Sequence, residues 1–271
     1  KNRFLLELDR SLLGFMEEGR FLDYGCGRAD VAAHVLSKNH WHGDLLEVDD
    51  TSRSLIREDS RFDKCQLYVS CDEVPDNSYD LILLFDVLEH LPEPEQVLAG
   101  IYQKLKSGGC LALVIPYRPS TWGWDDDHYG HLRRWKAKEL IRALEGQGLQ
   151  LLQMSDPTYP VYRFLRWAML HRQKPPESNS DSMQERSQKS PHNNAWKAPP
   201  PWTDHLPWNL INHLTLPFNK ILMGDEVYTL SIKSDEGLCC GHCDDGGTNS
   251  YLDYYDGHVL RECSHCHCRS L

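Results

Sequence analysis

Long hydrophobic runs are absent from this chain of 271 residues. No stretch approaches the roughly 18–20 apolar residues that a membrane-spanning helix needs, and no secretory signal is visible at the N-terminus. We therefore expect a cytoplasmic protein without a membrane span. An excess of positive charge is also absent, because the formal net charge is −11, and this argues against a nucleic-acid partner.

Cysteine is scarce over most of the chain and crowded at its end. Four of the ten cysteines are scattered through the first half, and six lie in the last 33 residues. In a chain without a secretory signal, crowded Cys-x-x-Cys pairs indicate metal binding in a reducing compartment rather than disulfides.

A third glycine is missing from the turn at residues 21–30. The sequence FLDYGCGRAD predicts a short buried strand, a turn at Gly25 and Gly27, and the start of a helix. A dinucleotide-binding turn has the pattern Gly-x-Gly-x-x-Gly, which seats a pyrophosphate on the helix N-terminus. Here Asp30 replaces the third glycine and Asp23 precedes the turn. These carboxylates suit a zwitterionic or cationic ligand such as S-adenosylmethionine (SAM), although a glycine turn also joins strands and helices without any ligand.

Strands and helices alternate after this turn. The apolar runs predict strands at 44–48, 66–70, 79–85 and 110–115, with helices at 30–36, from 53 and at 94–106. This order is typical of a doubly wound α/β fold, whose ligands bind at the carboxyl ends of the strands. Asp49 lies 22 residues after Gly27 (49 − 27), where a carboxylate either binds both ribose hydroxyls or caps the next helix.

The motifs FLDYGCG, Asp49, SYDLI, DVLEHLP and LKSGG occur in the order and at the intervals of a class I SAM-dependent methyltransferase. The chain resembles this family over roughly residues 1–155 and 225–233, and is most similar to the branch that acts on small molecules. The resemblance implies a Rossmann-like, seven-stranded, mostly parallel sheet, SAM as cofactor, and methyl transfer to oxygen, nitrogen or carbon of a small-molecule substrate.

The resemblance also implies the residues that contact SAM. They follow four strands: Asp23, Gly25, Cys26 and Gly27; then Asp49 and Asp50; then Ser70 and Cys71; and finally Asp86 and Val87. Two positions depart from the family pattern. Ala29 replaces its third glycine, and its adenine-contacting Asp falls near Ser70, with Asp72 two residues further on.

Histidines are the candidate general bases. Methyl transfer mainly requires alignment of the reacting atoms, and a base helps when the acceptor must lose a proton. His131 and His128 lie in a loop rich in aromatic and acidic residues after the fifth strand, and His90 is the third candidate. The alternative is that these histidines only hold the backbone.

We expect residues 1–155 and 225–234 to form the methyltransferase domain. Residues 156–224 form an insertion with a lid-like helix at 159–171, a disordered segment at 173–204 and a helix at 206–222. The alternative for the helix at 159–171 is that it contacts a membrane surface. Residues 225–233 alternate in hydropathy and predict a last, antiparallel strand.

The tail at 236–271 has the spacing of a small zinc ribbon. Two Cys-x-x-Cys pairs supply four thiolates for a structural Zn²⁺ site: Cys240, Cys243, Cys263 and Cys266. We expect strands at 251–255 and 258–261 and a protein partner for the ribbon. Two alternatives to a small-molecule methyltransferase stay open: a non-catalytic SAM-binding or partner-docking protein, and an RNA methyltransferase.

Overall fold

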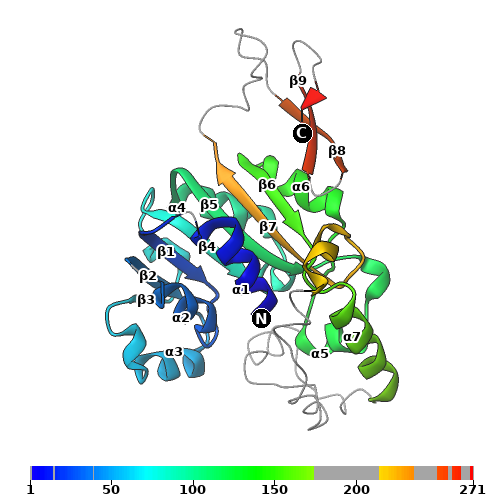
Figure 1. Cartoon of the computed structure of the whole chain (residues 1–271). Helices are drawn as coiled ribbons and strands as arrows, with labels where there is room; N and C mark the ends of the chain where they lie inside the picture. The colour runs from blue at the N-terminus through cyan, green and yellow to red at the C-terminus, as the bar shows by residue number, and fades with distance from the viewer. Residues whose placement is uncertain are drawn as a thin grey trace.

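A seven-stranded sheet forms the centre of the protein (Figure 1). The computed structural model describes residues 2–14, 16–38, 40–173, 214–234, 249–255, 258–263 and 269–270. The strands are β1 (Gly19–Tyr24), β2 (Trp41–Leu46), β3 (Gln66–Tyr68), β4 (Tyr79–Phe85), β5 (Leu105–Pro116), β6 (Leu149–Ser155) and β7 (Glu226–Lys233). The segment predicted to be disordered, 173–204, lies outside the described residues except for Gln173.

The strand order is β3-β2-β1-β4-β5-β7-β6. Four neighbouring pairs are parallel, whereas β7 runs antiparallel to both β5 and β6, as its sequence predicted. The sheet is therefore mixed, and the expectation of a mostly parallel sheet is corrected on this point. The order reverses between β1 and β4, which places a ligand crevice at the carboxyl ends of these two strands.

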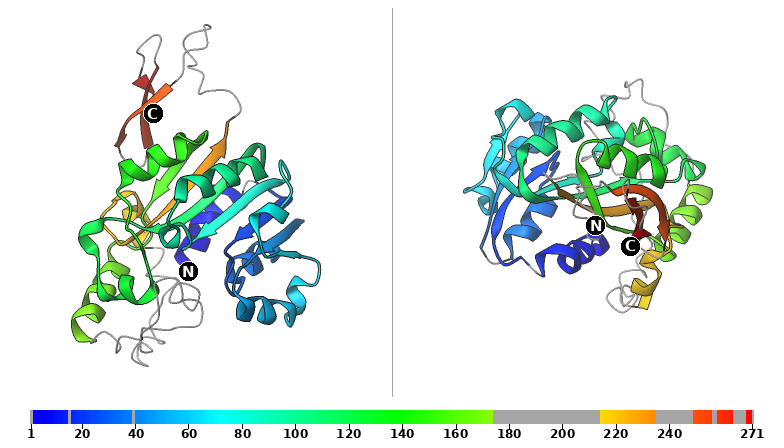
Figure 2. Two further views of the ribbon diagram at one scale, coloured as in Figure 1. Left: turned by 180° about the vertical axis from the view of Figure 1, so that it is seen from behind. Right: turned by 90° about the horizontal axis from the view of Figure 1, so that it is seen from above.

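Helices cover both faces of the sheet (Figure 2). On one face lie α1 (Asn2–Leu8), the π-helical turn η1 (Asp9–Leu13), α2 (Asp30–Leu36) and α3 (Asp50–Arg57); on the other lie α4 (Pro94–Lys104) and α6 (Ala137–Glu145). In β4, Leu81 and Leu83 pack toward the first group, and Ile82 and Leu84 toward the second. Burial on both faces explains why β4 is apolar without alternation.

Two predicted helix boundaries differ from the structure. The helix predicted over 94–106 ends at Lys104, and β5 starts at Leu105, because Gly108 takes its left-handed φ of +73° inside the strand rather than as a helix cap. The helix after β2 starts at Asp50 rather than near Arg53, because Asp49 itself is the N-cap. Of the helix predicted at 206–222, the described part is a helical turn at Leu214–Thr215 that continues as the 3₁₀ turn η7 (Leu216–Lys220).

The tail contains a second, three-stranded antiparallel sheet. Its strands are β8 (Asn249–Tyr255), β9 (His258–Cys263) and β10 (Arg269–Ser270). β8 and β9 lie where the sequence predicted two strands of a ribbon. Of the four predicted zinc ligands, Cys263 ends β9, and Cys240, Cys243 and Cys266 lie outside the described residues. Within the described part of the chain, no helix combines the length and apolar character needed to cross a membrane.

Candidate functional site

The turn after β1 is built from left-handed backbone. Gly25 has φ +71°, Gly27 has φ +56°, and Ala29, at the position of the family's third glycine, has φ +55°. A Cβ on Gly25 would lie 2.7 Å from the Cγ2 of Val87, so the first turn and the loop after β4 are in close contact. Gly25 of the predicted turn therefore lies against Val87, which the sequence analysis expected to contact SAM.

Two carboxylates already occupy the amides of this turn. The Gly27 amide donates to Oε2 of Glu47 at 2.6 Å, and the Ala32 amide, in the first turn of α2, donates to Oδ2 of Asp23 at 3.1 Å. Both acids are buried. These are the donors that would face a pyrophosphate in a dinucleotide site. An anionic ligand here would face two carboxylates instead of open amides.

Glu47 also joins the first turn to the end of β2. Its Oε1 accepts from the Asp49 amide at 2.8 Å, while the Asp49 Oδ2 accepts from the Ser52 amide at 2.7 Å and caps α3. A ribose ligand and a helix cap were both predicted for Asp49, and the structure shows the cap. Asp50 next to it is exposed and pairs with Arg53.

Apolar side chains stand exposed at the ends of β2 and β3. Val48, two residues after the mostly buried strand β2, is 59% exposed, and Val69, directly after β3, is 42% exposed. Ser70 caps the 3₁₀ turn η3 (Cys71–Glu73) by accepting from the Asp72 amide at 3.3 Å. Two exposed valines beside a polar turn form a surface suited to a flat heterocycle.

Cysteine chemistry is disfavoured at the first turn. Burial, with the nearby carboxylates of Asp23 and Glu47, raises the pKa of the Cys26 thiol far above its usual range. The thiol stays protonated at neutral pH, so Cys26 lines the turn without being a nucleophile.

Asp86 occupies strained backbone after β4. Its φ is +56°, a conformation that costs a non-glycine residue roughly 1–2 kcal/mol, and its side chain is exposed. Strain of this kind persists where neighbouring structure fixes it. Asp86 directly precedes Val87, which lies against the Gly25 turn, and its role as a cleft residue stays a prediction.

The loop after β5 is anchored on one buried carboxylate, Asp126 in α5 (Trp124–Tyr129). Its oxygens accept from His131 Nδ1 at 2.8 Å, from Arg134 Nε at 2.8 Å and from Arg166 at 3.0 Å. Burial alone would raise the pKa of Asp126, but the hydrogen bonds from His131 and Arg134 outweigh it and lower the pKa to about 2. Asp126 is therefore ionised at neutral pH and fixes the ring of His131.

Two of the three candidate histidines come together. The rings of His90 and His131 are 4.9 Å apart, centre to centre, in an edge-to-face arrangement. Burial, and then His131, lowers the pKa of His90 to about 4. His128 lies apart from this pair, with its ring against Tyr129.

Acidic groups gather on the same side of the crevice. Burial, and then Asp86, raises the pKa of Glu89 well above its usual range. Burial and the same Asp86 raise the pKa of Glu226, the first residue of β7, to about 8. Since both carboxyls respond to Asp86, the ends of β4 and β7 form one acidic region beside the paired histidines.

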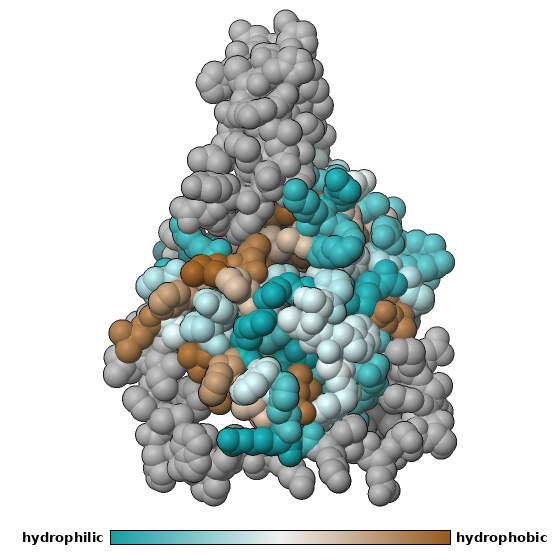
Figure 3. Space-filling model, turned by 90° about the vertical axis from the view of Figure 1, so that its right-hand side faces the viewer, coloured by the Kyte–Doolittle hydropathy of each residue, from teal (hydrophilic) through white to brown (hydrophobic). Residues whose placement is uncertain are grey.

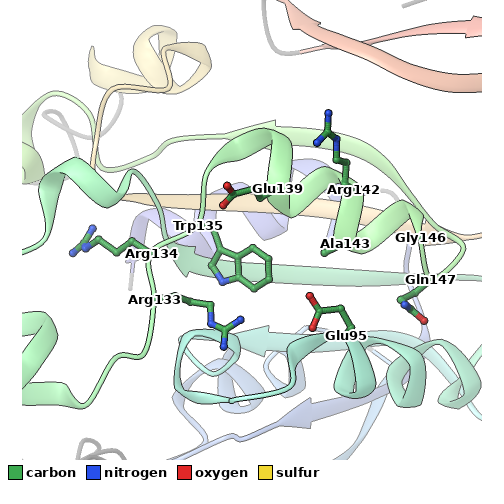
Figure 4. A pocket seen from close by; sticks show the side chains of 9 residues that line it. All are labelled: Glu95, Arg133, Arg134, Trp135, Glu139, Arg142, Ala143, Gly146 and Gln147. Atoms are coloured by element: carbon green, nitrogen blue, oxygen red, sulfur yellow. The ribbon is translucent and has the colours of Figure 1, made fainter.

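A pocket of about 510 Å³ lies elsewhere, between α4 and α6 on one face of the sheet (Figure 4). Its walls combine acidic and basic side chains with the ring of Trp135, and Arg134 points away from the other side chains. The lining residues are Glu95, Arg133, Arg134, Trp135, Glu139, Arg142, Ala143, Gly146 and Gln147. None of the sequence-predicted site residues lines it.

Three functional residues were missed by the sequence analysis. No sequence motif pointed to Glu47, because it lies between two features that sequence patterns do mark, the buried strand β2 and Asp49. Asp126 was grouped with the acidic loop, and Arg166 belongs to α7 (Val161–Arg172), in the predicted insertion. The basic residues among the apolar and aromatic side chains of α7 were the available sign that this helix carries a buried ion pair.

The strand order and the glycine turn after β1 together define a Rossmann-like protein. The chain matches the family model described as "Methyltransferase domain" over residues 2–154, more than half of its length. It belongs to this methyltransferase family.

The chain is also similar to a curated methyltransferase over part of its length. The demethylmenaquinone methyltransferase of Listeria welshimeri is 30% identical over 114 residues, which are 38% of this chain and 47% of that protein. The match thus spans about half the length of the curated relatives.

The solved phosphoethanolamine N-methyltransferase 2 of Haemonchus contortus, in complex with SAM, has a TM-score of 0.52 at 16% identity, covering 86% of this chain and 53% of that chain. The 4+2 cyclase SpnF has a TM-score of 0.56 at 17% identity, covering 86% and 81%. At these identities the likeness shows the fold alone.

Proposed function

We propose that the chain is a SAM-dependent methyltransferase that methylates oxygen, nitrogen or carbon of a small-molecule acceptor. The observation that carries this proposal is the pair of carboxylates, Asp23 and Glu47, on the amides of the glycine turn. They disfavour a diphosphate and favour a ligand with an ammonium and a sulfonium group. Membership of the methyltransferase family supports the same cofactor, as does the SAM-bound Haemonchus contortus neighbour.

In this proposal the cofactor lies across the ends of β1 to β4. Gly25, Cys26 and Gly27 surround its methionine part, and Asp49 with Asp50 binds the ribose. Val48 and Val69 flank the adenine, with Ser70 and Cys71 at its edge. Asp86 and Val87 line the place where the methyl group meets the acceptor. The exposed valines support this arrangement because stacking on a heterocycle gives them a partner.

Alignment of acceptor, methyl and sulfur is the main catalytic contribution of such a site. Among the predicted general bases, His131 has the best-supported position, because Asp126 holds its Nδ1 and leaves the lone pair on Nε2, which lies 3.9 Å from Oε1 of Glu89. His90 is adjacent, and His128, whose ring lies against Tyr129, stays a prediction. The name of the Listeria relative does not fix the acceptor of this chain.

Calorimetry with S-adenosylhomocysteine and NAD⁺ tests the cofactor. We expect binding of the first and none of the second. Gly25→Ala should weaken S-adenosylhomocysteine binding more than tenfold, because the new Cβ meets Val87. Gly108→Ala is the matched control: its φ of +73° gives similar strain, and nothing lies within 4 Å of the added Cβ.

Binding of NAD⁺ in place of S-adenosylhomocysteine would refute the proposal. Binding of S-adenosylhomocysteine without methylated product from SAM over a broad panel of small molecules would favour the non-catalytic alternative. Salt-sensitive RNA binding with methylated RNA as product would favour the RNA methyltransferase.

A further inference from the structure

Three side chains from two separate parts of the chain meet beside the crevice. Glu89 and His90 lie in the 3₁₀ turn η4 (Leu88–His90) after β4, and His131 follows α5. One oxygen or nitrogen of each lies within 4.8 Å of the other two. The backbone fixes this meeting, because the Leu132 amide donates to the Glu89 carbonyl at 2.9 Å.

The hydrogen bonds define which ring nitrogens carry protons. His90 Nδ1 lies 3.3 Å from the carbonyl oxygen of Gly130, and a carbonyl only accepts. His131 Nδ1 lies 2.8 Å from the carboxylate of Asp126, which is also an acceptor. Each neutral ring therefore carries its proton on Nδ1, and each presents the lone pair of Nε2.

Both lone pairs face the carboxyl group of Glu89. Its Oε1 lies 3.9 Å from Nε2 of His90 and 3.9 Å from Nε2 of His131, too far for a hydrogen bond. The Glu89 side chain is 1% exposed, and among the described residues neither of its oxygens has a hydrogen-bond partner. A buried carboxyl group without a partner is costly, so its environment points to a missing positive charge.

We propose that Glu89, His90 and His131 bind a divalent transition-metal cation. Two imidazoles and one carboxylate suit Zn²⁺, Fe²⁺ or Co²⁺ better than Mg²⁺ or Ca²⁺, which prefer oxygen ligands. Bonds of about 2.1 Å in a tetrahedral site would place the ligand atoms about 3.4 Å apart, so the 3.9 Å separations need only a small contraction.

The outer contacts match those of a metal site. Each histidine donates the N–H of its other ring nitrogen, Nδ1, to a fixed acceptor: His131 to the Asp126 carboxylate and His90 to the Gly130 carbonyl. Three protein ligands leave coordination positions for water or for an oxygen of the acceptor. This last point rests on the proposed function, whereas cation binding itself does not.

Cobalt titration of the full chain, stripped of metal beforehand, tests the site. Equilibrium dialysis measures bound Co²⁺ per chain, and visible absorption reports the ligands. The variants are Glu89→Gln, His90→Ala and His131→Ala, and the matched control is His42→Ala, an exposed histidine of β2. Every variant has the same tail, so any Co²⁺ that its cysteines bind does not change the difference in bound Co²⁺ between variants.

We expect the wild type and His42→Ala to bind one Co²⁺ more per chain than each of the three site variants. Equal stoichiometry in all five proteins would overturn the proposal. Circular dichroism checks folding; if His131→Ala does not fold, Glu89→Gln and His90→Ala still decide, since they alter side chains of a single turn. Calorimetry with S-adenosylhomocysteine, done on the same samples, reports separately on the proposed function.

Discussion

Backbone conformation, residue by residue, shapes the turn after β1. Gly25, Gly27 and Ala29 all have positive φ, although only two are glycine. The alanine pays roughly 1–2 kcal/mol for this conformation, and its buried methyl group packs in the core beneath α2. The structure therefore accommodates a methyl group at the position where the family has a glycine.

Asp49 has two roles that substitution can separate. Asp49→Ser keeps a good helix cap, so stability should change by only a few tenths of a kcal/mol, but it removes the proposed ribose carboxylate. Because hydrogen bonds to a charged group contribute about 1.5–3 kcal/mol, S-adenosylhomocysteine affinity should fall at least tenfold. Calorimetry and urea denaturation measure the two effects.

Asp49→Ala is the companion variant and should lose about 1 kcal/mol of stability as well as affinity. Wild-type affinity of Asp49→Ser for S-adenosylhomocysteine would show that Asp49 is only a helix cap. Glu47 would then hold the turn, and Asp49 would not contact the ribose.

Local sequence predicted the residues whose role depends on their own strand. The glycine turn, Asp86, His90 and His131 all lie in motifs read in order along the chain, and the roles assigned to these residues stay predictions. The roles of Asp126 and Arg134 depend on distant partners: Arg134 donates to the Asp225 carbonyl, 91 residues further on, at 2.9 Å. No periodicity or spacing reports such a pairing, so the sequence analysis missed it.

At the scale of elements, α7 is tied to the loop over the crevice through one arginine. Arg166 binds Asp125 with two hydrogen bonds, of 2.8 and 2.7 Å, and reaches Asp225, just before β7, at 3.0 Å. All three side chains are buried. The helix predicted as a lid is thus fixed to α5 and β7 through a buried ion-pair network.

The outer surface of α7 differs from its anchored side. Phe164 is 64% exposed and Trp167 is 54% exposed. On the face of the molecule that includes α7, hydrophobic side chains form separate patches between polar ones (Figure 3). The helix is therefore held by charge pairs rather than by a continuous apolar stripe.

Arg166→Met should destabilise the protein by about 3–5 kcal/mol, because it leaves buried carboxylates without their donor. Arg163→Met on the same helix is the control: Arg163 makes an exposed hydrogen bond to the Met223 carbonyl, and its loss should cost less than about 1 kcal/mol. Guanidinium denaturation compares the two variants. Equal, small losses would show that the network does not stabilise the fold.

At the scale of the whole molecule, β7 completes the sheet. Its residues pair with β5 from Cys110 to Pro116 and with β6 from Leu149 to Ser155. We therefore propose that residues 225–234 belong to one domain with residues 1–155, and that the tail at 236–271 is a separate unit. The zinc ribbon assigned to that tail stays a prediction, as does its protein partner.

Truncation tests this division. A chain ending at residue 234 should unfold cooperatively and bind S-adenosylhomocysteine, because it keeps every strand of the large sheet. A chain ending at residue 225 should aggregate or unfold without cooperativity, because β5 and β6 both lose their shared neighbour. Thermal denaturation and size-exclusion chromatography compare the two. Cooperative unfolding of the shorter chain would contradict the proposed division.

The position of β7 has a consequence for the protein during translation. The ribosome finishes β6 and then synthesises 70 residues, 156–225, before the strand that fits between β5 and β6 begins. At the usual 5–20 residues per second this interval lasts about 4–14 s. For that time β6 has no partner strand and β5 has only β4, and we expect the nascent chain to depend on chaperones until β7 emerges.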